Sequence, residues 1–134
     1  MNNQKKINIL IFFILGIFII INSGCTSIIP PDYDDNYIVS YVHVKPSSVT
    51  MQLGSSKKFE IVAYDSENNL IPINPAEVNW EVAYQCWACG KVWKLSPESG
   101  SKTTTFTPEK VGKYWIYGYY KDEVDYDYSV INVE

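Results

Sequence analysis

The stretch Val78-Asn-Trp-Glu-Val-Ala-Tyr84 alternates between large apolar side chains and polar or small ones. Successive side chains of a β-strand point to opposite faces, so this period of two predicts a strand that is buried on one face only. Its predicted core face carries Val78, Trp80, Val82 and Tyr84, and its outer face carries Asn79, Glu81 and Ala83. The run over residues 57–64 alternates in the same way, and its predicted core face carries Phe59, Ile61 and Ala63.

Short runs of this kind recur along the chain from residue 37 onward. They are rich in Val, Ile, Tyr, Phe and Thr, and groups of Pro, Gly, Ser and Asn separate them at fairly even intervals. This spacing is typical of an all-β sandwich or barrel, and no segment shows sustained helical periodicity. We expect strands over residues 37–44, 49–53, 57–64, 77–84, 92–95, 103–107, 112–120 and 126–133.

The last predicted strand does not keep one phase. Tyr126, Tyr128 and Val130 are in step, whereas Ile131 and Val133 belong to the other face. A β-bulge, or burial on both faces, would explain the slip.

The N-terminus has the three-part layout of a secretory signal. A basic segment that ends at Lys6 precedes an apolar run over residues 7–21, and small residues follow it. The apolar run is shorter than the roughly 20 residues of a membrane-spanning helix, which favours cleavage over permanent spanning.

The residues Ser23-Gly24-Cys25 resemble the lipobox of bacterial lipoproteins, although Asn22 stands where that family usually has an aliphatic residue. The resemblance implies that residues 1–24 are a signal peptide that forms a helix before its removal, and that Cys25 carries diacylglyceryl and palmitate-type chains. An uncleaved N-terminal anchor and an ordinary signal cut nearby stay open as alternatives. All three place the rest of the chain outside the cytoplasm. Lipidation would hold it on a bacterial membrane, facing the cell surface or the periplasm.

Residues 26–36 contain paired prolines and clustered acids, which favour a solvated tether after Cys25 over a packed element. Residues 37–134 then form one domain of ordinary size. The chain has 11 basic and 15 acidic side chains, and all the basic ones are lysines. An acidic surface repels phosphate backbones, and a chain without arginine lacks the side chain that most often makes paired hydrogen bonds to a nucleotide base. We therefore expect no nucleic-acid partner.

Several ordered pieces of residues 37–134 resemble the bacterial immunoglobulin-like domains of surface proteins. They are Val44-Lys-Pro-Ser-Ser-Val-Thr-Met-Gln-Leu-Gly54, Lys58-Phe-Glu-Ile-Val-Ala-Tyr-Asp65, Val78-Asn-Trp80, Pro97-Glu-Ser-Gly100, Thr105-Phe-Thr107 and Val111-Gly-Lys-Tyr-Trp-Ile116. The resemblance implies an immunoglobulin-like antiparallel β-sandwich of about seven to eight strands. It also implies a spacer, an adhesion module, a carbohydrate binder or an accessory part of a surface assembly, without catalytic residues.

The chain departs from these domains at residues 85–93, where Cys86-Trp-Ala-Cys89 and a second tryptophan interrupt a usually short connection. In an exported protein we expect Cys86 and Cys89 to form a local disulfide. A thiol–disulfide redox pair is the alternative, but the residues after Cys89 indicate a turn and a strand, not the helix of a thioredoxin-like site. One cysteine pair supplies only half of a zinc site, so we expect no metal.

The segment Lys113-Tyr-Trp-Ile-Tyr-Gly-Tyr-Tyr120 is unusually aromatic. Alternation places Tyr114, Ile116 and Gly118 on its core face, so Trp115, Tyr117 and Tyr119 project from the opposite face of the sheet. Exposed Trp and Tyr are favoured in interfaces and stack on sugar rings, which predicts a binding face for a protein or a carbohydrate. Alternatively, Trp87, Trp93 and the insertion around them fold over this stripe and bury it.

The remaining polar residues do not predict an enzyme. His43 is expected to be an outward strand residue without a nucleophile motif, and no cofactor is implied. The acids at 122, 123, 125 and 127 indicate a charged strand edge in preference to a cation site. We therefore expect a membrane-anchored, non-catalytic binding or structural module, with an exported redox protein and a passive spacer as alternatives.

Overall fold

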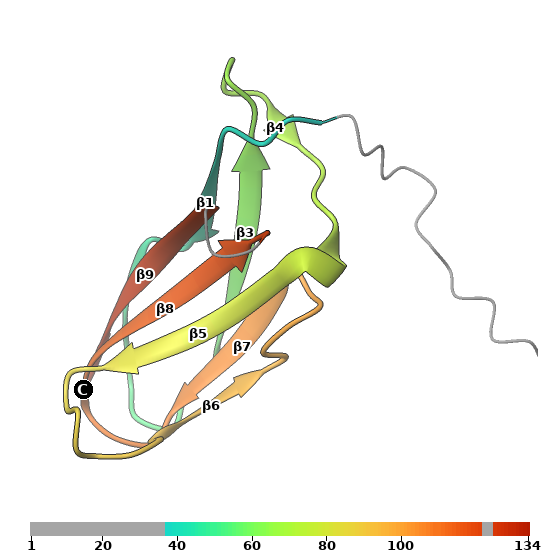
Figure 1. Cartoon of the computed structure of the whole chain (residues 1–134). Helices are drawn as coiled ribbons and strands as arrows, with labels where there is room; N and C mark the ends of the chain where they lie inside the picture. The colour runs from blue at the N-terminus through green and yellow to red at the C-terminus, as the bar shows by residue number, and fades with distance from the viewer. Residues whose placement is uncertain (1–36, 122–124) are drawn as a thin grey trace, which may run out of the picture. The chain divides into compact units, whose positions relative to one another are not determined.

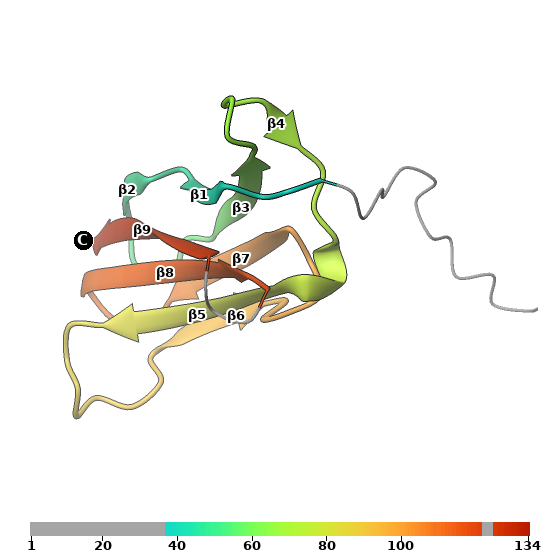
Figure 2. The same cartoon turned by 45° about the horizontal axis from the view of Figure 1, so that its top comes forward.

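The computed structural model describes residues 37–121 and 125–134. The predicted signal peptide, Cys25 and the tether lie outside this part of the chain, as do Asp122 and Glu123. The described residues form two β-sheets that face each other across an apolar core (Figures 1 and 2). The predicted all-β sandwich is thus confirmed, and no helix of the described residues is long and apolar enough to cross a membrane.

Each sheet is built from strands that are distant in sequence. The first sheet has the order β1 (Tyr41–Lys45), β3 (Lys57–Tyr64), β7 (Thr103–Pro108) and β6 (Trp93–Ser96), with β4 (Leu70–Ile71) beside β3. The second sheet has the order β2 (Ser48–Met51), β9 (Asp125–Val133), β8 (Gly112–Tyr120) and β5 (Val78–Tyr84). A 3-10 turn over Pro75–Glu77 leads into β5.

All eight predicted strands are found, most of them with bounds that differ by one or two residues at an end, and β4 is an addition. It is too short to show an alternation in sequence, and it forms because Ala63 and Tyr64 of β3 pair with it. The strand pairs are antiparallel except β2 and β9, which are parallel. This exception arises because the chain crosses from the first sheet to the second between β1 and β2.

The predicted core faces meet inside the sandwich. Phe59, Ile61 and Ala63 from β3 are fully buried, as are Tyr114 and Ile116 from β8. Burying side chains as large as those of Phe59, Ile61 and Ile116 contributes about 1.5–3 kcal/mol each. The core also includes Val78 and Trp80 of β5, as expected. Val82 and Tyr84 pack against it but stay partly exposed, because β5 is an edge strand.

Gly118 makes the close packing of Trp80 possible. The two residues are paired across β5 and β8, and Gly118 is buried beneath the indole. A Cβ at position 118 would lie 2.9 Å from Val44 Cγ2, 3.1 Å from Trp80 Cζ3 and 3.2 Å from Ile61 Cδ1. The absent side chain is therefore part of the core packing.

The last strand contains no bulge. Its register with β8 is unbroken from Gly112 opposite Val133 to Tyr120 opposite Asp125, so the bulge considered from sequence is wrong. Ser129, Ile131 and Val133 face the core, whereas Tyr126 and Tyr128 lie on the outer face and are exposed. The phase slips in sequence because the outer face of this strand is aromatic and one core position is a serine.

Candidate functional site

The outer face of the second sheet carries four tyrosines that come from two neighbouring strands. Tyr117 and Tyr119 belong to β8, and Tyr126 and Tyr128 belong to β9. The hairpin register places Tyr117 opposite Tyr128 and Tyr119 opposite Tyr126. We call these four residues the tyrosine cluster.

The rings of the tyrosine cluster contact one another within each pair and between pairs. The ring centres lie 5.5 Å apart for Tyr117 and Tyr128 and 5.6 Å apart for Tyr119 and Tyr126. Tyr117 lies 6.2 Å from both Tyr119 and Tyr126. These separations are those of mutually stabilising aromatic pairs, so the cluster holds its own geometry.

The cluster is open to solvent although the opposite face of the same strands is closed. Tyr126 is 55% exposed and Tyr128 is 44% exposed, and Tyr117 and Tyr119 are partly exposed. Two polar side chains of β5 border the cluster, Asn79 and Glu81, and Glu81 Oε2 accepts a hydrogen bond of 2.9 Å from the Tyr119 hydroxyl. A flat apolar surface with hydroxyl groups and one carboxylate can stack on a ring and exchange hydrogen bonds at its edge.

Trp115 continues the aromatic surface along β8. It lies opposite Val130 of β9 and Ala83 of β5, and it is partly exposed. The Lys113 ammonium lies 5.5 Å from the centre of a Trp115 ring, which is a cation–π distance. The predicted stripe of Trp115, Tyr117 and Tyr119 therefore lies on one surface, on the side away from the core.

Trp87 and Trp93 do not cover this stripe, so the burial considered from sequence is wrong. The Trp87 side chain is fully exposed in the loop after β5. Trp93 is on β6 in the first sheet, and its ring meets the buried ring of Tyr114 edge-on at 6.2 Å. The five aromatic residues named from sequence are thus divided between two places.

Trp87 and Trp93 line a separate hollow of about 330 Å³ at the end of β5, together with Ala83, Tyr84, Cys86 and Gly90. Cys86 and Cys89 form the expected disulfide, with a Cα separation of 5.5 Å. The Cys89 N–H donates to the Cys86 carbonyl at 3.3 Å, so a turn and a covalent bond close the same short loop.

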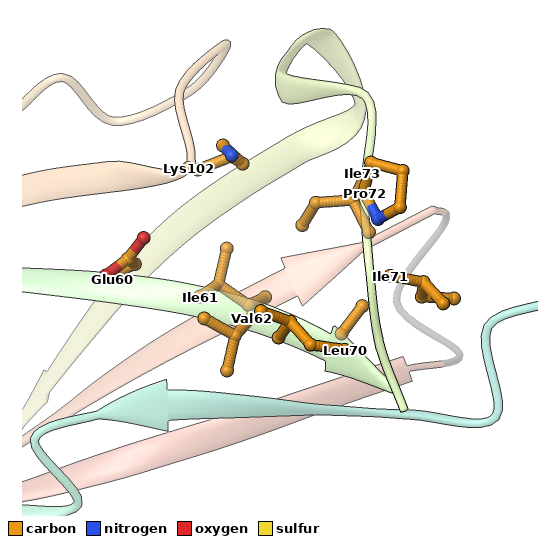
Figure 3. A pocket seen from close by; sticks show the side chains of 9 residues that line it. Glu60, Ile61, Val62, Leu70, Ile71, Pro72, Ile73 and Lys102 are labelled. Atoms are coloured by element: carbon orange, nitrogen blue, oxygen red, sulfur yellow. The ribbon is translucent and has the colours of Figure 1, made fainter. Parts of the chain in front are cut away.

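A second hollow of about 330 Å³ lies between β3 and β4 (Figure 3). β3 changes its partner there, because residues 57–60 pair with β7 whereas Ala63 and Tyr64 pair with β4. The walls are mostly apolar, and Figure 3 shows Glu60 on β3 itself and Lys102 on a neighbouring segment. The hollow therefore follows from the divergence of two strands and brings no set of reactive groups together.

Titratable groups are not concentrated on the aromatic face. In residues 37–121 and 125–134, no three His, Cys, Asp or Glu side chains lie close enough to share a metal ion. His43 is exposed, and its Nδ1 lies 3.1 Å from Asp127 Oδ2 at the β1 edge. Burial raises the pKa of Tyr114, whose hydroxyl donates to the Lys110 carbonyl at 2.7 Å inside the sandwich.

Sequence reasoning missed Tyr126 and Tyr128 as members of the site. Their alternation was visible, but it conflicted with that of Ile131 and Val133 at the end of the same strand. A hairpin register that aligned residue 117 with residue 128 would have revealed the four tyrosines together.

No protein-family profile matches the sequence, and the search of curated proteins finds no match. Solved structures with the same fold are found. Domains 5–6 of the S-layer protein SbsC superpose with a TM-score of 0.52 at 16% identity, over 72% of this chain and 44% of that chain. The ZirS C-terminal domain superposes with a TM-score of 0.51 at 16% identity, over 77% of this chain and 76% of that chain. At such identities the likeness concerns the fold.

Proposed function

We propose that this chain is an exported bacterial lipoprotein, anchored through Cys25, whose β-sandwich is a non-catalytic binding module. The partner binds the outer face of the second sheet, at the tyrosine cluster and Trp115. The observation that carries this proposal is the contact of four tyrosine rings on a solvent-facing sheet surface.

An exposed aromatic surface of this kind promotes aggregation unless a partner covers it. Large contiguous apolar patches on soluble domains mark interaction sites more often than not, and tyrosine supplies contact area at a low cost in side-chain entropy. The sandwich core on the other side is already filled by residues such as Tyr114 and Ile116. The outer tyrosines therefore add nothing to the core, and they stabilise the sheet only through their contacts with one another.

The proposed location rests on three further observations. The N-terminal sequence has the layout of a lipoprotein signal. The disulfide between Cys86 and Cys89 suits an oxidising compartment. The fold is also that of domains 5–6 of an S-layer protein, which is compatible with a place at the cell surface.

The proposal is tested by capture from cell-envelope extracts with the full chain in detergent. The variant Y117T/Y128T removes one facing pair of the cluster and places threonine, which also favours β-strands, at both positions. The matched control is Y41T/Y64T, because Tyr41 and Tyr64 form another stacked cross-strand pair, with ring centres 5.1 Å apart on the first sheet.

We expect the wild type and Y41T/Y64T to retain the same envelope component and Y117T/Y128T to lose it, with cooperative unfolding preserved in all three proteins. Equal capture by the two variants, or no capture by the wild type, would contradict a binding role for this face. A passive spacer would then be the better description.

A further inference from the structure

We infer that the ligand of this face is an uncharged linear polysaccharide that lies along the β8–β9 hairpin. This inference rests on the proposed function and names the chemical class of the partner. Two features of the face carry it: its near-neutral charge and the regular repeat of its aromatic steps.

The outer face of the second sheet is almost free of charge. Among the outward positions of its four strands, only Glu81 and Lys113 are charged, and their charges are opposite. Each is already engaged, Glu81 with the Tyr119 hydroxyl and Lys113 with the Trp115 ring. The whole chain has a net charge of −4, so a polyanion would be repelled and a polycation would meet a single carboxylate.

The aromatic groups repeat at a regular interval along the hairpin. The first step is the pair Tyr119 and Tyr126, the second is Tyr117 and Tyr128, and the third is Trp115 beside Val130. Residues on one face of a strand recur about every 7 Å, and the Tyr117 and Tyr119 rings lie 6.2 Å apart. A periodic surface of this kind suits a periodic ligand, and an extended chain of sugar rings repeats on a comparable length.

The rings of these steps lie on the face of the sheet and not at a strand edge. β8 is paired on both sides, with β5 and β9, whereas β9 is paired with β2 only from Val130 to Val133. A ligand that lies across the rings is recognised by side chains, whereas a peptide that extends a sheet binds at a strand edge. Aromatic faces contact the C–H faces of sugar rings, and the bordering tyrosine hydroxyls reach the sugar hydroxyl groups.

The test is native gel electrophoresis of the full chain in detergent, with a soluble polymer in the gel. Hydroxyethylcellulose, xyloglucan, glucomannan and dextran serve as uncharged probes, and polygalacturonate serves as the anionic probe. We expect at least one uncharged polymer to retard the wild type and Y41T/Y64T equally. The affinity of Y117T/Y128T should be at least about tenfold lower than that of the wild type, because two stacking rings are lost.

A second variant tests whether the bound ligand extends along the hairpin as far as Trp115. W115T removes only the third step, so it should weaken binding of a hexasaccharide of the retarding polymer and leave binding of its disaccharide unchanged, as measured by titration calorimetry. Equal loss for both lengths would overturn a ligand that extends along the hairpin.

The outcomes separate this inference from the proposed function. If no uncharged polymer retards the wild type, or if polygalacturonate alone does so, the polysaccharide inference is overturned. If envelope capture then still depends on Tyr117 and Tyr128 and is abolished by protease treatment of the extract, the binding module stands with a protein partner. If envelope capture does not depend on Tyr117 and Tyr128 either, both proposals fail.

Discussion

The carboxylate of Asp127 accepts a hydrogen bond of 2.9 Å from the backbone N–H of Val44. Asp127 belongs to β9 in the second sheet, and Val44 belongs to β1 at the edge of the first sheet. One side chain therefore satisfies an edge-strand N–H and ties the two sheets together. The sequence predicted a charged strand edge at Asp127, and the structure shows that its carboxylate accepts a hydrogen bond from the Val44 N–H.

Replacing Asp127 should destabilise the sandwich. In D127A the Val44 N–H loses a charged acceptor, which costs about 1.5–3 kcal/mol of unfolding free energy. D127N keeps an acceptor oxygen and should lose less. Urea unfolding measures both, with the exposed E67A as control. A D127A protein as stable as E67A would show that the bond contributes nothing.

Ser129, two residues further along β9, should respond in the opposite direction. Its side chain is fully buried, and its Oγ has no hydrogen-bond partner in the part of the chain that the structure describes. S129A removes an unpaired polar atom from the core, so its unfolding free energy should equal or exceed that of the wild type by about 1 kcal/mol. A clear loss of stability in thermal unfolding would mean that the hydroxyl is satisfied in solution.

Gly118→Ala should cost about 1–3 kcal/mol, because the added methyl group would lie too close to Val44 and Trp80. The indole of Trp80 is held from its other end by a 2.9 Å hydrogen bond to the Ser101 carbonyl, so it cannot simply withdraw. T105A on the exposed side of β7 is the control in urea unfolding. Equal stability of the two variants would refute the close packing.

Asp65 gives a prediction for pH dependence. Hydrogen bonds from the side chain and backbone of Asn69 hold its pKa below the usual 3.8. A depressed pKa means that the contribution to stability is present above the unfolded pKa and is lost as the pH falls through the folded value. The turn over residues 65–69 should therefore keep its NMR shifts at pH 4 and loosen below that. Loosening already above pH 4, in the wild type but not in D65N, would contradict this.

Reduction of the disulfide between Cys86 and Cys89 should have a small global effect. The bond closes a loop of four residues, for which the chain-entropy term is at most about 2 kcal/mol. The turn hydrogen bond within the loop remains after reduction. We expect unfolding with and without dithiothreitol to differ by less than this amount, and C86A/C89A to match the reduced protein. A larger loss would show that the loop supports the core.

Much of the fold could be predicted because alternation is a local property. Trp80, Phe59 and Tyr114 each lie among neighbours of the right period, and each is buried as expected. The short strand β4 carries no such pattern, since two residues cannot show a period. The parallel pairing of β2 with β9 joins segments about 80 residues apart, and no local signal specifies it.

The site was predicted only in part for the same reason. Trp115, Tyr117 and Tyr119 follow from one strand, whereas their contact with Tyr126 and Tyr128 depends on the register between two strands. The position of Trp87, which is fully exposed, depends on the path of a loop whose sequence allows it to fold over the sheet or away from it.

The sequence by itself determined the all-β class, most strands, the inward and outward faces of β5 and β8, and the cysteine pair that forms the disulfide. These properties depend on side-chain periodicity and on neighbours a few residues apart. Only the tertiary structure decided which strands adjoin, that the tyrosines of β8 and β9 form one cluster, and that Asp127 reaches Val44. Such contacts depend on strand register and sheet packing. These are determined by interactions between segments far apart in the chain, so no single segment's sequence specifies them.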